Sequence, residues 1–336
     1  MTEISNAQVG IEETPRKLGR RAVVTGAAGF IGSQVCRALL RDGWSVTGID
    51  GFTDSYDPVE KIMRAASLAR LAGMTLVVGN LADMDLDTHL QGIEVVFHLA
   101  GRAGVRASFS SEALYVRDNV IATERLLGAA RRAGIRRLVY ASSSSVYGDG
   151  EVPFREEATP SPISPYGRSK LEAERACMSA DGAGIETTAL RYFTVFGPGQ
   201  RPDMGLRLFA EAALAGEPIT LLGDGSQRRD FTYVTDVVAA TMAAADRPVT
   251  GLAINIGGGC SVSISEVLAL LAQLTGAELL IDRQPFARGD VRVTSADLSR
   301  ARLLLGFTPL VPFEVGYESQ VAWIRERMGQ KVGVPV

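Results

Sequence analysis

Tyr166 and Lys170 stand four residues apart in the segment SPYGRSK. If this segment is helical, the two side chains lie on one face, one turn apart. A tyrosine with its ordinary pKa of about 10 is a poor base at neutral pH, but a neighbouring ammonium group favours its phenolate. The spacing therefore predicts that Tyr166 accepts a proton and that Lys170 stabilises the resulting charge. A pair of this kind also occurs on solvated helix faces, so it needs supporting features.

Four serines stand at 142–145: Ser142 ends the apolar segment RRLVYAS, and the other three precede VYG. If the apolar segment is a strand of a parallel sheet, these hydroxyls lie at its carboxyl end, where open α/β sheets bind ligands. We expect the hydroxyl of Ser143 to hydrogen-bond the substrate oxygen that gives its proton to Tyr166. The alternative is that the serines only form a polar turn after the strand.

Three glycines, Gly26, Gly29 and Gly32, follow the first apolar segment in GAAGFIG. A glycine turn between a strand and a helix directs backbone N–H groups and the positive end of the helix to one place, which suits a pyrophosphate. Asp50 ends the next apolar segment, near the spacing at which a carboxylate binds the ribose hydroxyls of a dinucleotide. Its charge would repel a 2′-phosphate, which favours NAD over NADP. The alternatives are that the glycines only allow tight packing at the start of a helix, and that Asp50 only ends a strand.

From residue 20 onward, short β-branched segments alternate with longer amphipathic ones, which is typical of a parallel sheet covered by helices on both faces. The predicted strands are residues 21–25, 44–50, 74–78, 94–100, 136–142 and 186–192. The predicted helices are residues 31–41, 58–71, 111–133 and 165–178, the first three of them followed by glycine. The sequence thus predicts an α/β fold with a doubly wound parallel sheet of the Rossmann type.

After Tyr192 the alternation weakens, and glycine and proline cluster at 196–205 and 221–227. This indicates a smaller C-terminal α/β lobe. The pattern of residues 231–256 predicts a strand, a helix and a strand, and we expect this segment to return to the large domain. The predicted organisation is a loose tail over 1–18 and a cofactor domain over 19–192 with 231–256. A second lobe, over 193–230 and 257–330, is expected to bind substrate.

The composition excludes several classes of protein. The chain has 336 residues, 46% of them hydrophobic, and a net charge of −3, which excludes a polybasic nucleic-acid binder. Cys36, Cys177 and Cys260 are far apart and only two histidines are present, so we expect no metal site. We also expect no membrane contact and a cytoplasmic location, since residues 1–17 lack a signal-peptide core and no apolar run of about 18 residues follows.

The motifs occur in an order that resembles the extended branch of the short-chain dehydrogenase/reductase superfamily, the nucleotide-sugar epimerases and dehydratases. They are GxxGxxG, the acidic end of the second strand, HLAG, the serines with VYG, YxxxK, RYFTVFGPGQRPDM and RRDFTYVTDVV. The resemblance covers about residues 20–325 and is greatest to the UDP-glucuronate 4-epimerases. It implies bound NAD, a UDP-sugar substrate and a homodimer formed through helices 111–133 and 165–178.

The resemblance also implies roles for single residues. Cofactor contacts are expected, beyond the three glycines, Asp50, Tyr166 and Lys170, at Phe30, Ile31, Asn80, Leu81, Leu99, Ala100, Arg102, Asn119 and Tyr192. Substrate contacts are expected at Ser144, Ser145 and Thr194, which would hold a uronate carboxylate, and at Arg201, Arg229, Arg288 and Asp290. Asn80 and Gly101 depart from the family, which usually has Asp and Ala at these two places.

In the family, the shared first step removes a hydride from sugar carbon 4 while the tyrosine takes the hydroxyl proton. The Asp-Glu pair that the 4,6-dehydratases have after the position of Ser143 is replaced here by two serines, and the Glu of the decarboxylases is replaced by Ser145. Epimerisation needs neither group. We therefore expect inversion at carbon 4, with UDP-glucuronate as the first candidate substrate and UDP-glucose as the second. Decarboxylation of UDP-glucuronate is the third candidate reaction. A non-catalytic dinucleotide-binding regulator is the alternative of another class, and the intact Tyr166–Lys170 pair argues against it.

Overall fold

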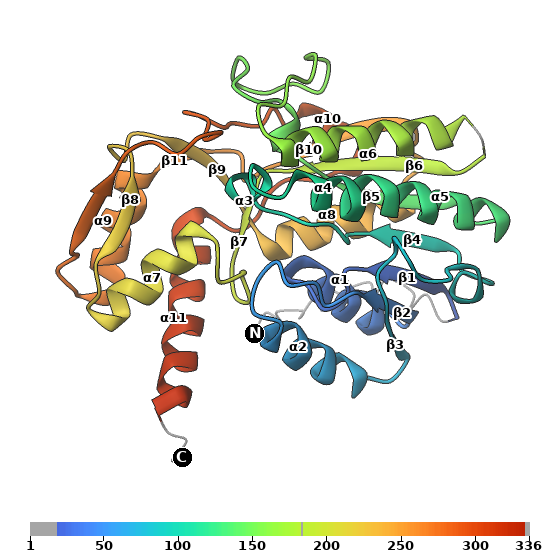
Figure 1. The fold of residues 1–336 in the computed structure, drawn as a ribbon, viewed down its shortest axis with the longest axis horizontal. Coiled ribbons are helices and arrows are strands. Elements are labelled where there is room, and N and C mark those ends of the chain that lie inside the picture. The colour runs from blue at the N-terminus through green and yellow to red at the C-terminus, as the bar shows by residue number, and fades with distance from the viewer. Residues whose placement is uncertain (1–18, 183, 333–336) are drawn as a thin grey trace, which may run out of the picture.

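The computed structural model describes residues 19–182 and 184–332, so the predicted tail over 1–18 lies outside the described residues. Seven parallel strands form the main sheet, in the order β10-β6-β5-β4-β1-β2-β3 (Figure 1). They are β1 (Arg21–Thr25), β2 (Ser45–Asp50), β3 (Met74–Val78), β4 (Val95–His98), β5 (Arg137–Ser143), β6 (Glu186–Tyr192) and β10 (Leu252–Ile256). This confirms the predicted doubly wound α/β fold.

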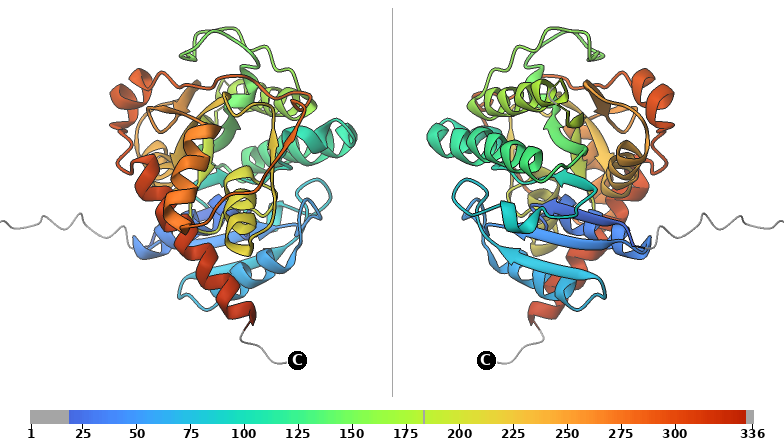
Figure 2. Two further views of the ribbon diagram at one scale, coloured as in Figure 1. Left: turned by 90° about the vertical axis from the view of Figure 1, so that its left-hand side faces the viewer. Right: turned by 90° about the vertical axis from the view of Figure 1, so that its right-hand side faces the viewer.

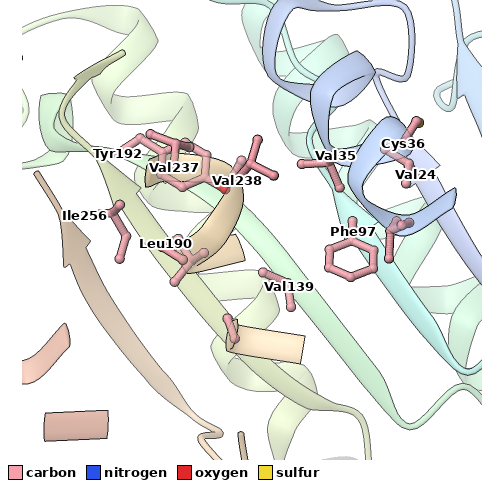
Figure 3. Close-up of a cluster of buried hydrophobic side chains, with 14 of the residues drawn as sticks. Val24, Val35, Cys36, Phe97, Val139, Leu190, Tyr192, Val237, Val238 and Ile256 are labelled. Atoms are coloured by element: carbon pink, nitrogen blue, oxygen red, sulfur yellow. The ribbon is translucent and has the colours of Figure 1, made fainter. Parts of the chain in front are cut away.

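Helices cover both faces of this sheet because alternate strand residues point to opposite sides. Phe97 and Val139 pack with α1 (Phe30–Arg41) and α8 (Val234–Asp246), and Figure 3 shows both in one cluster with Val35 of α1 and Val237 of α8. Their neighbours Val96 and Leu138 pack on the other face. The elements there are α5 (Ala122–Arg132) and α6 (Pro165–Asp181), while α2 (Val59–Ala69) lies beside α1 near the β3 edge.

The predicted helix over 111–133 is divided into three parts. It comprises α4 (Glu112–Tyr115), a π-helical turn η2 (Val116–Ile121) and α5. The π turn contains Asn119, which is buried, and its amide bonds the backbone of Arg102 and the hydroxyl of Ser169. Wide turns of this kind occur mostly at functional sites. The other predicted elements differ from the observed ones only at their ends; α6, for example, runs to Asp181.

A smaller lobe follows the main sheet and lies at one end of it (Figures 1 and 2). One of its sheets contains β7 (Thr194–Phe196), β9 (Arg228–Tyr233) and β11 (Ser261–Ser263), and the other contains β8 (Ile219–Leu222) and β12 (Ile281–Gln284). Its longer helices are α7 (Gly205–Ala215), α9 (Ile264–Thr275) and α11 (Phe313–Val332). The predicted segment 231–256 is divided, because β9 pairs in the smaller lobe while α8 and β10 belong to the main sheet. The remaining short elements are α3 (Val105–Ser108), α10 (Ser299–Leu305), η1 (Asp87–His89) and η3 (Ser144–Val146).

Over residues 19–182 and 184–332, none of the helices is long and apolar enough to cross a bilayer.

Candidate active site

The glycine turn after β1 is too tight for side chains. Gly26 has a φ of +69°, and a Cβ atom there would lie 2.9 Å from the backbone of Ala100. A Cβ on Gly32 would overlap the carbonyl oxygen of Gly26, to which the N–H of Gly29 donates at 3.0 Å. In the described part of the chain, no side chain caps the start of α1 at Gly29. Open amides and a positive helix end above a bare turn fit a dinucleotide pyrophosphate.

Asp50 ties the end of β2 to this turn. One carboxylate oxygen accepts the N–H of Ala28 at 3.0 Å, and the other accepts the N–H of Phe52 at 2.8 Å. Asp50 is 8% exposed, and each oxygen keeps a lone pair for a ribose hydroxyl. Lys61 lies near it with its ammonium bonded to Thr53; burial lowers the pKa of Lys61 and the charge of Asp50 raises it.

The other expected cofactor residues lie around the carboxyl edge of the sheet, but several are already engaged. Asn80 accepts the N–H of Ala82 at 2.9 Å with its side-chain oxygen. Arg102 pairs with Asp118 at 2.9 Å. Tyr192 is 7% exposed and its hydroxyl bonds Thr241 at 2.7 Å within the main core.

Leu81 belongs to the core beneath α5, and Leu99 and Ala100 follow β4 directly, where Ala100 meets Gly26. Phe30 starts α1 and Ile31 follows it. These positions place backbone and apolar atoms around the glycine turn.

Tyr166 and Lys170 lie in the first turns of α6, which begins at Pro165 with Ser164 as its N-cap. Burial raises the pKa of Tyr166, whereas the hydroxyl of Ser143 and the charge of Arg201 lower it. The structure therefore brings Tyr166 and Ser143 together, and it makes Arg201 the cation that lowers this pKa, a role that the sequence indicated for Lys170.

The ammonium of Lys170 is 4.4 Å from the ring centroid of Tyr140, a cation–π contact. Lys170 is 6% exposed, and burial lowers its pKa to about 8 against the opposing effects of Cys177 and Glu174. A lysine with this pKa is still mostly charged at neutral pH.

A buried ion pair lies under the serines. Glu174 on α6 accepts the hydroxyl of Ser142 and pairs with Arg191 of β6 at 2.6 Å. Arg191 also donates to the hydroxyl of Tyr147 at 2.8 Å. These residues were not predicted from the sequence, although Glu174 follows Lys170 by one helical turn, a spacing that indicates a shared helix face. The network fixes β5, β6 and α6 relative to one another directly below the site.

The expected carboxylate-binding residues lie at the same edge. The Ser143 hydroxyl accepts the N–H of Ser145 at 3.1 Å, which orients the turn over Ser144 and Ser145. Ser143 pairs in register with Tyr192, two residues before Thr194 begins β7. Side chains from the ends of β5 and β7 are thus brought to one place.

The residues expected to bind the nucleotide half come from both lobes. Asp290 lies 3.9 Å from Arg229 and 3.8 Å from Arg106, which follows β4 in α3. Arg288 covers the ring of Phe109 at 4.5 Å. Arg106 was missed from the sequence because a lone arginine in a loop is usually a solvated charge. Arg288 and Asp290 therefore contact residues that follow β4 across the junction of the lobes, and Arg229 lies beside Asp290.

A cavity of about 500 Å³ opens at the opposite edge of the sheet, lined by Arg20, Glu94, Arg137, Glu186 and Arg247. It lies at the amino ends of β4, β5 and β6. Parallel sheets bind ligands at their carboxyl ends, so we assign this cavity no part in the site.

Comparison with known proteins agrees with this geometry. A UDP-glucuronate 4-epimerase of Thermodesulfobacterium geofontis is 36% identical over 312 residues, which cover 91% of this chain and 96% of that one. The crystal structure of UDP-glucuronic acid 4-epimerase from Bacillus cereus with UDP-glucuronic acid and NAD has a TM-score of 0.89 and 36% identity, covering 91% of this chain and 99% of that one. MoeE5 in complex with UDP-glucose and NAD has a TM-score of 0.85 and 40% identity, covering 92% and 99%.

The family model described as the NAD dependent epimerase/dehydratase family matches residues 22–257, which include the glycine turn, the serines and the Tyr166–Lys170 pair. The chain belongs to the NAD dependent epimerase/dehydratase family.

Proposed function

We propose that this protein is an NAD-dependent 4-epimerase that converts UDP-glucuronate to UDP-galacturonate through a 4-keto intermediate. The observation that carries the proposal is the position of Tyr166 beside Ser143 at the carboxyl end of β5, one turn before Lys170 on α6. Solved relatives that bind NAD together with UDP-glucuronic acid support it.

In the proposed reaction, Tyr166 accepts the proton of the hydroxyl on carbon 4 and later returns it, while Ser143 holds that oxygen in place. The positive charges of Lys170 and Arg201 stabilise the phenolate. NAD, held by the glycine turn and Asp50, supplies the acceptor and donor of the hydride. The sugar must turn over between the two hydride transfers, and neither transfer needs a further acid or base.

The uronate carboxylate is assigned to the hydroxyls of Ser144, Ser145 and Thr194. A 4-keto uronate is a β-keto acid, and it loses carbon dioxide when the bond to the carboxylate stands perpendicular to the carbonyl plane. Three hydroxyls that fix the carboxylate away from this alignment would suppress that reaction, which is an effect of orientation.

The nucleotide half is assigned to the lobe over 193–230 and 257–330. Arginine forks bind phosphate oxygens well, which suits Arg229 and Arg288 to the diphosphate, and Asp290 to the uridine ribose. Arg201 is assigned to the segment covering the sugar; it pairs with Asp203 at 2.8 and 3.0 Å.

UDP-glucose is the second candidate substrate, because MoeE5 binds it in a solved complex. Incubation of the purified protein with UDP-glucuronate, UDP-glucose and dTDP-glucose, followed by NMR of the products, tests both. We expect UDP-galacturonate from the first substrate and little product from the others. Faster conversion of UDP-glucose would overturn the uronate assignment, and release of carbon dioxide by the wild type would favour a decarboxylase.

We also propose a cytoplasmic homodimer. Leu114, Val116 and Ile121, along the helical segment from α4 to α5, are 38–43% exposed. Exposed apolar side chains gathered on one segment favour a second copy of the chain as partner. Light scattering that finds only monomer at micromolar concentration would contradict the dimer.

A further inference from the structure

Glu60 on α2 is a buried carboxylate that none of the roles above uses. It is 9% exposed, and its oxygens contact three arginines from three helices. Arg64, on α2 itself, lies at 2.9 Å, and Arg207 on α7 is paired through both of its terminal nitrogens, one of them at 2.9 Å. Arg327 on α11 lies at 3.2 Å. The carboxylate thus joins the edge of the cofactor domain to two helices of the smaller lobe, which lie beside it in Figures 1 and 2.

Two of these arginines also hold successive carbonyl groups of the segment after β7. Arg64 donates to the oxygen of Gly199 at 2.8 Å, and Arg207 donates to the oxygen of Gln200 at 2.7 Å. Arg64 reaches the glycine turn as well, at the oxygen of Ala28, 3.4 Å away. Two neighbouring peptide groups are therefore fixed from opposite lobes, with Glu60 between their donors.

The next residue in the chain is Arg201. Its guanidinium lies 6.0 Å from the ring centroid of Tyr56 and acts electrostatically on Tyr166. We propose that Glu60 is a positioning residue: through Arg64 and Arg207 it fixes the segment Gly199–Arg201 and so holds the guanidinium of Arg201 beside Tyr166. The catalytic importance of this position rests on the proposed function, but the positioning itself does not.

Electrostatics explains why one carboxylate matters so much here. Without it, three guanidinium groups that are 5–29% exposed at their side chains would repel one another with no shared counter-charge. These arginines lower the pKa of Glu60, so the carboxylate stays charged at neutral pH. Loss of that charge should spread the arginines and release the two carbonyls that they hold.

Other groups also face Tyr166, and they belong to different elements. Ser143 reaches it from β5, and the ring of Tyr115 on α4 lies 6.1 Å away. Lys170 lies on the same helix as Tyr166. None of these three contacts Glu60, so a change at Glu60 should reach Tyr166 only through Arg201.

The test is the pKa of Tyr166 itself, measured in the full NAD-free chain by NMR of ¹³Cζ-labelled tyrosine, with Tyr166→Phe assigning the signal. Glu60→Gln should raise this pKa by about 0.5 or more, because a stabilising cation moves away. Glu211→Gln is the matched control: Glu211 also pairs with Arg207, at 2.7 Å, but lies on the solvent side of α7. It should leave the pKa of Tyr166 unchanged.

Two further variants isolate the route. In an Arg201→Gln background, Glu60→Gln should cause no additional rise, since coupled residues are not additive. Arg64→Lys keeps the positive charge beside Glu60 but loses the guanidinium group that reaches Gly199, so it should also raise the pKa of Tyr166. This variant provides the test if Glu60→Gln does not fold. An unchanged pKa of Tyr166 in the folded Glu60→Gln and Arg64→Lys proteins, or an equal rise in both backgrounds, would overturn the proposal.

Kinetics then separates this inference from the proposed function. If wild type epimerises UDP-glucuronate, the acid limb of kcat should move to higher pH in Glu60→Gln and stay in place in Glu211→Gln. If wild type does not epimerise it, the proposed function fails while the NMR titration still decides the positioning role.

Discussion

Lys170→Met should stabilise the NAD-free protein while it removes most of the activity. The ammonium of Lys170 is buried; it lies over the ring of Tyr140, with the carboxylate of Glu174 and the thiol of Cys177 farther away. A lysine in such surroundings lowers stability in its charged form, because burial removes its hydration. Methionine has a similar shape and carries no charge.

The magnitude follows from the pKa. Its net fall from the ordinary 10.5 to about 8 corresponds to a cost of about 3 kcal/mol at neutral pH. The cation–π contact with Tyr140, which methionine lacks, offsets about 1–2 kcal/mol of this. We therefore expect Lys170→Met to be more stable than wild type by about 1–2 kcal/mol at pH 7.

Denaturant unfolding at several pH values measures this directly. Because burial lowers the folded-state pKa, the folded protein binds fewer protons than the unfolded chain between about pH 8 and 10.5. The stability contributed by Lys170 therefore rises with pH across this window, and the advantage of the variant should vanish above it. Lys61→Met is the comparison: burial lowers the pKa of Lys61 as well, but its ammonium donates to the backbone oxygen of Thr53 at 3.0 Å, a bond that methionine loses, so this variant should gain less stability than Lys170→Met.

A Lys170→Met protein less stable than wild type at pH 7, or a difference that does not change with pH, would refute the reasoning. Either result would mean that contacts in the folded protein stabilise the ammonium by more free energy than its burial costs. The activity of the same variant is a separate readout, and we expect it to fall at least about a hundredfold, the typical worth of a group that assists proton transfer.

Three other predictions concern the site. Tyr166→Phe should abolish epimerisation and retain NAD, and turnover within tenfold of wild type would exclude Tyr166 as the base. NAD should bind at least about tenfold more tightly than NADP, or about 1.4 kcal/mol, because the negative charge of Asp50 would repel a 2′-phosphate; calorimetry that finds equal affinities would contradict this. Thr194→Ala, or Ser144→Ala with Ser145→Ala, should release carbon dioxide and a UDP-4-keto-pentose, seen by NMR and by NADH absorbance; variants that are slower but form only the 4-epimer would remove these hydroxyls from control of the carboxylate.

The features that could be predicted from the sequence are those set by local geometry. Gly26 and Gly32 are needed wherever a strand turns into a helix this tightly, so their spacing indicated the turn. Tyr166 and Lys170 are one helical turn apart. Parallel strands all end at one edge, and this brings Ser143 to α6 without knowledge of any contact between them.

What the sequence did not reveal depends on contacts between distant segments. Nothing in helix propensity distinguishes the π turn around Asn119 from ordinary helix, because the wide turn is stabilised by bonds to Arg102 and Ser169. The proximity of Arg106 to Asp290 likewise arises only when the two lobes meet. The sequence around a charged residue does not show which distant residue it pairs with.

The pKa of Tyr166 depends both on local geometry and on contacts between distant segments. The spacing of Tyr166 and Lys170 pointed to the cation on the same helix, whereas in the structure burial raises the pKa of Tyr166 and the cation that opposes this rise is Arg201, from a segment that enters the smaller lobe. Arg64 and Arg207 hold that segment at Gly199 and Gln200 from the two lobes. In our proposal the pKa of Tyr166 therefore depends on the contacts that join the two lobes. A change in those contacts alters the pKa of this proton acceptor without any change at Tyr166 itself.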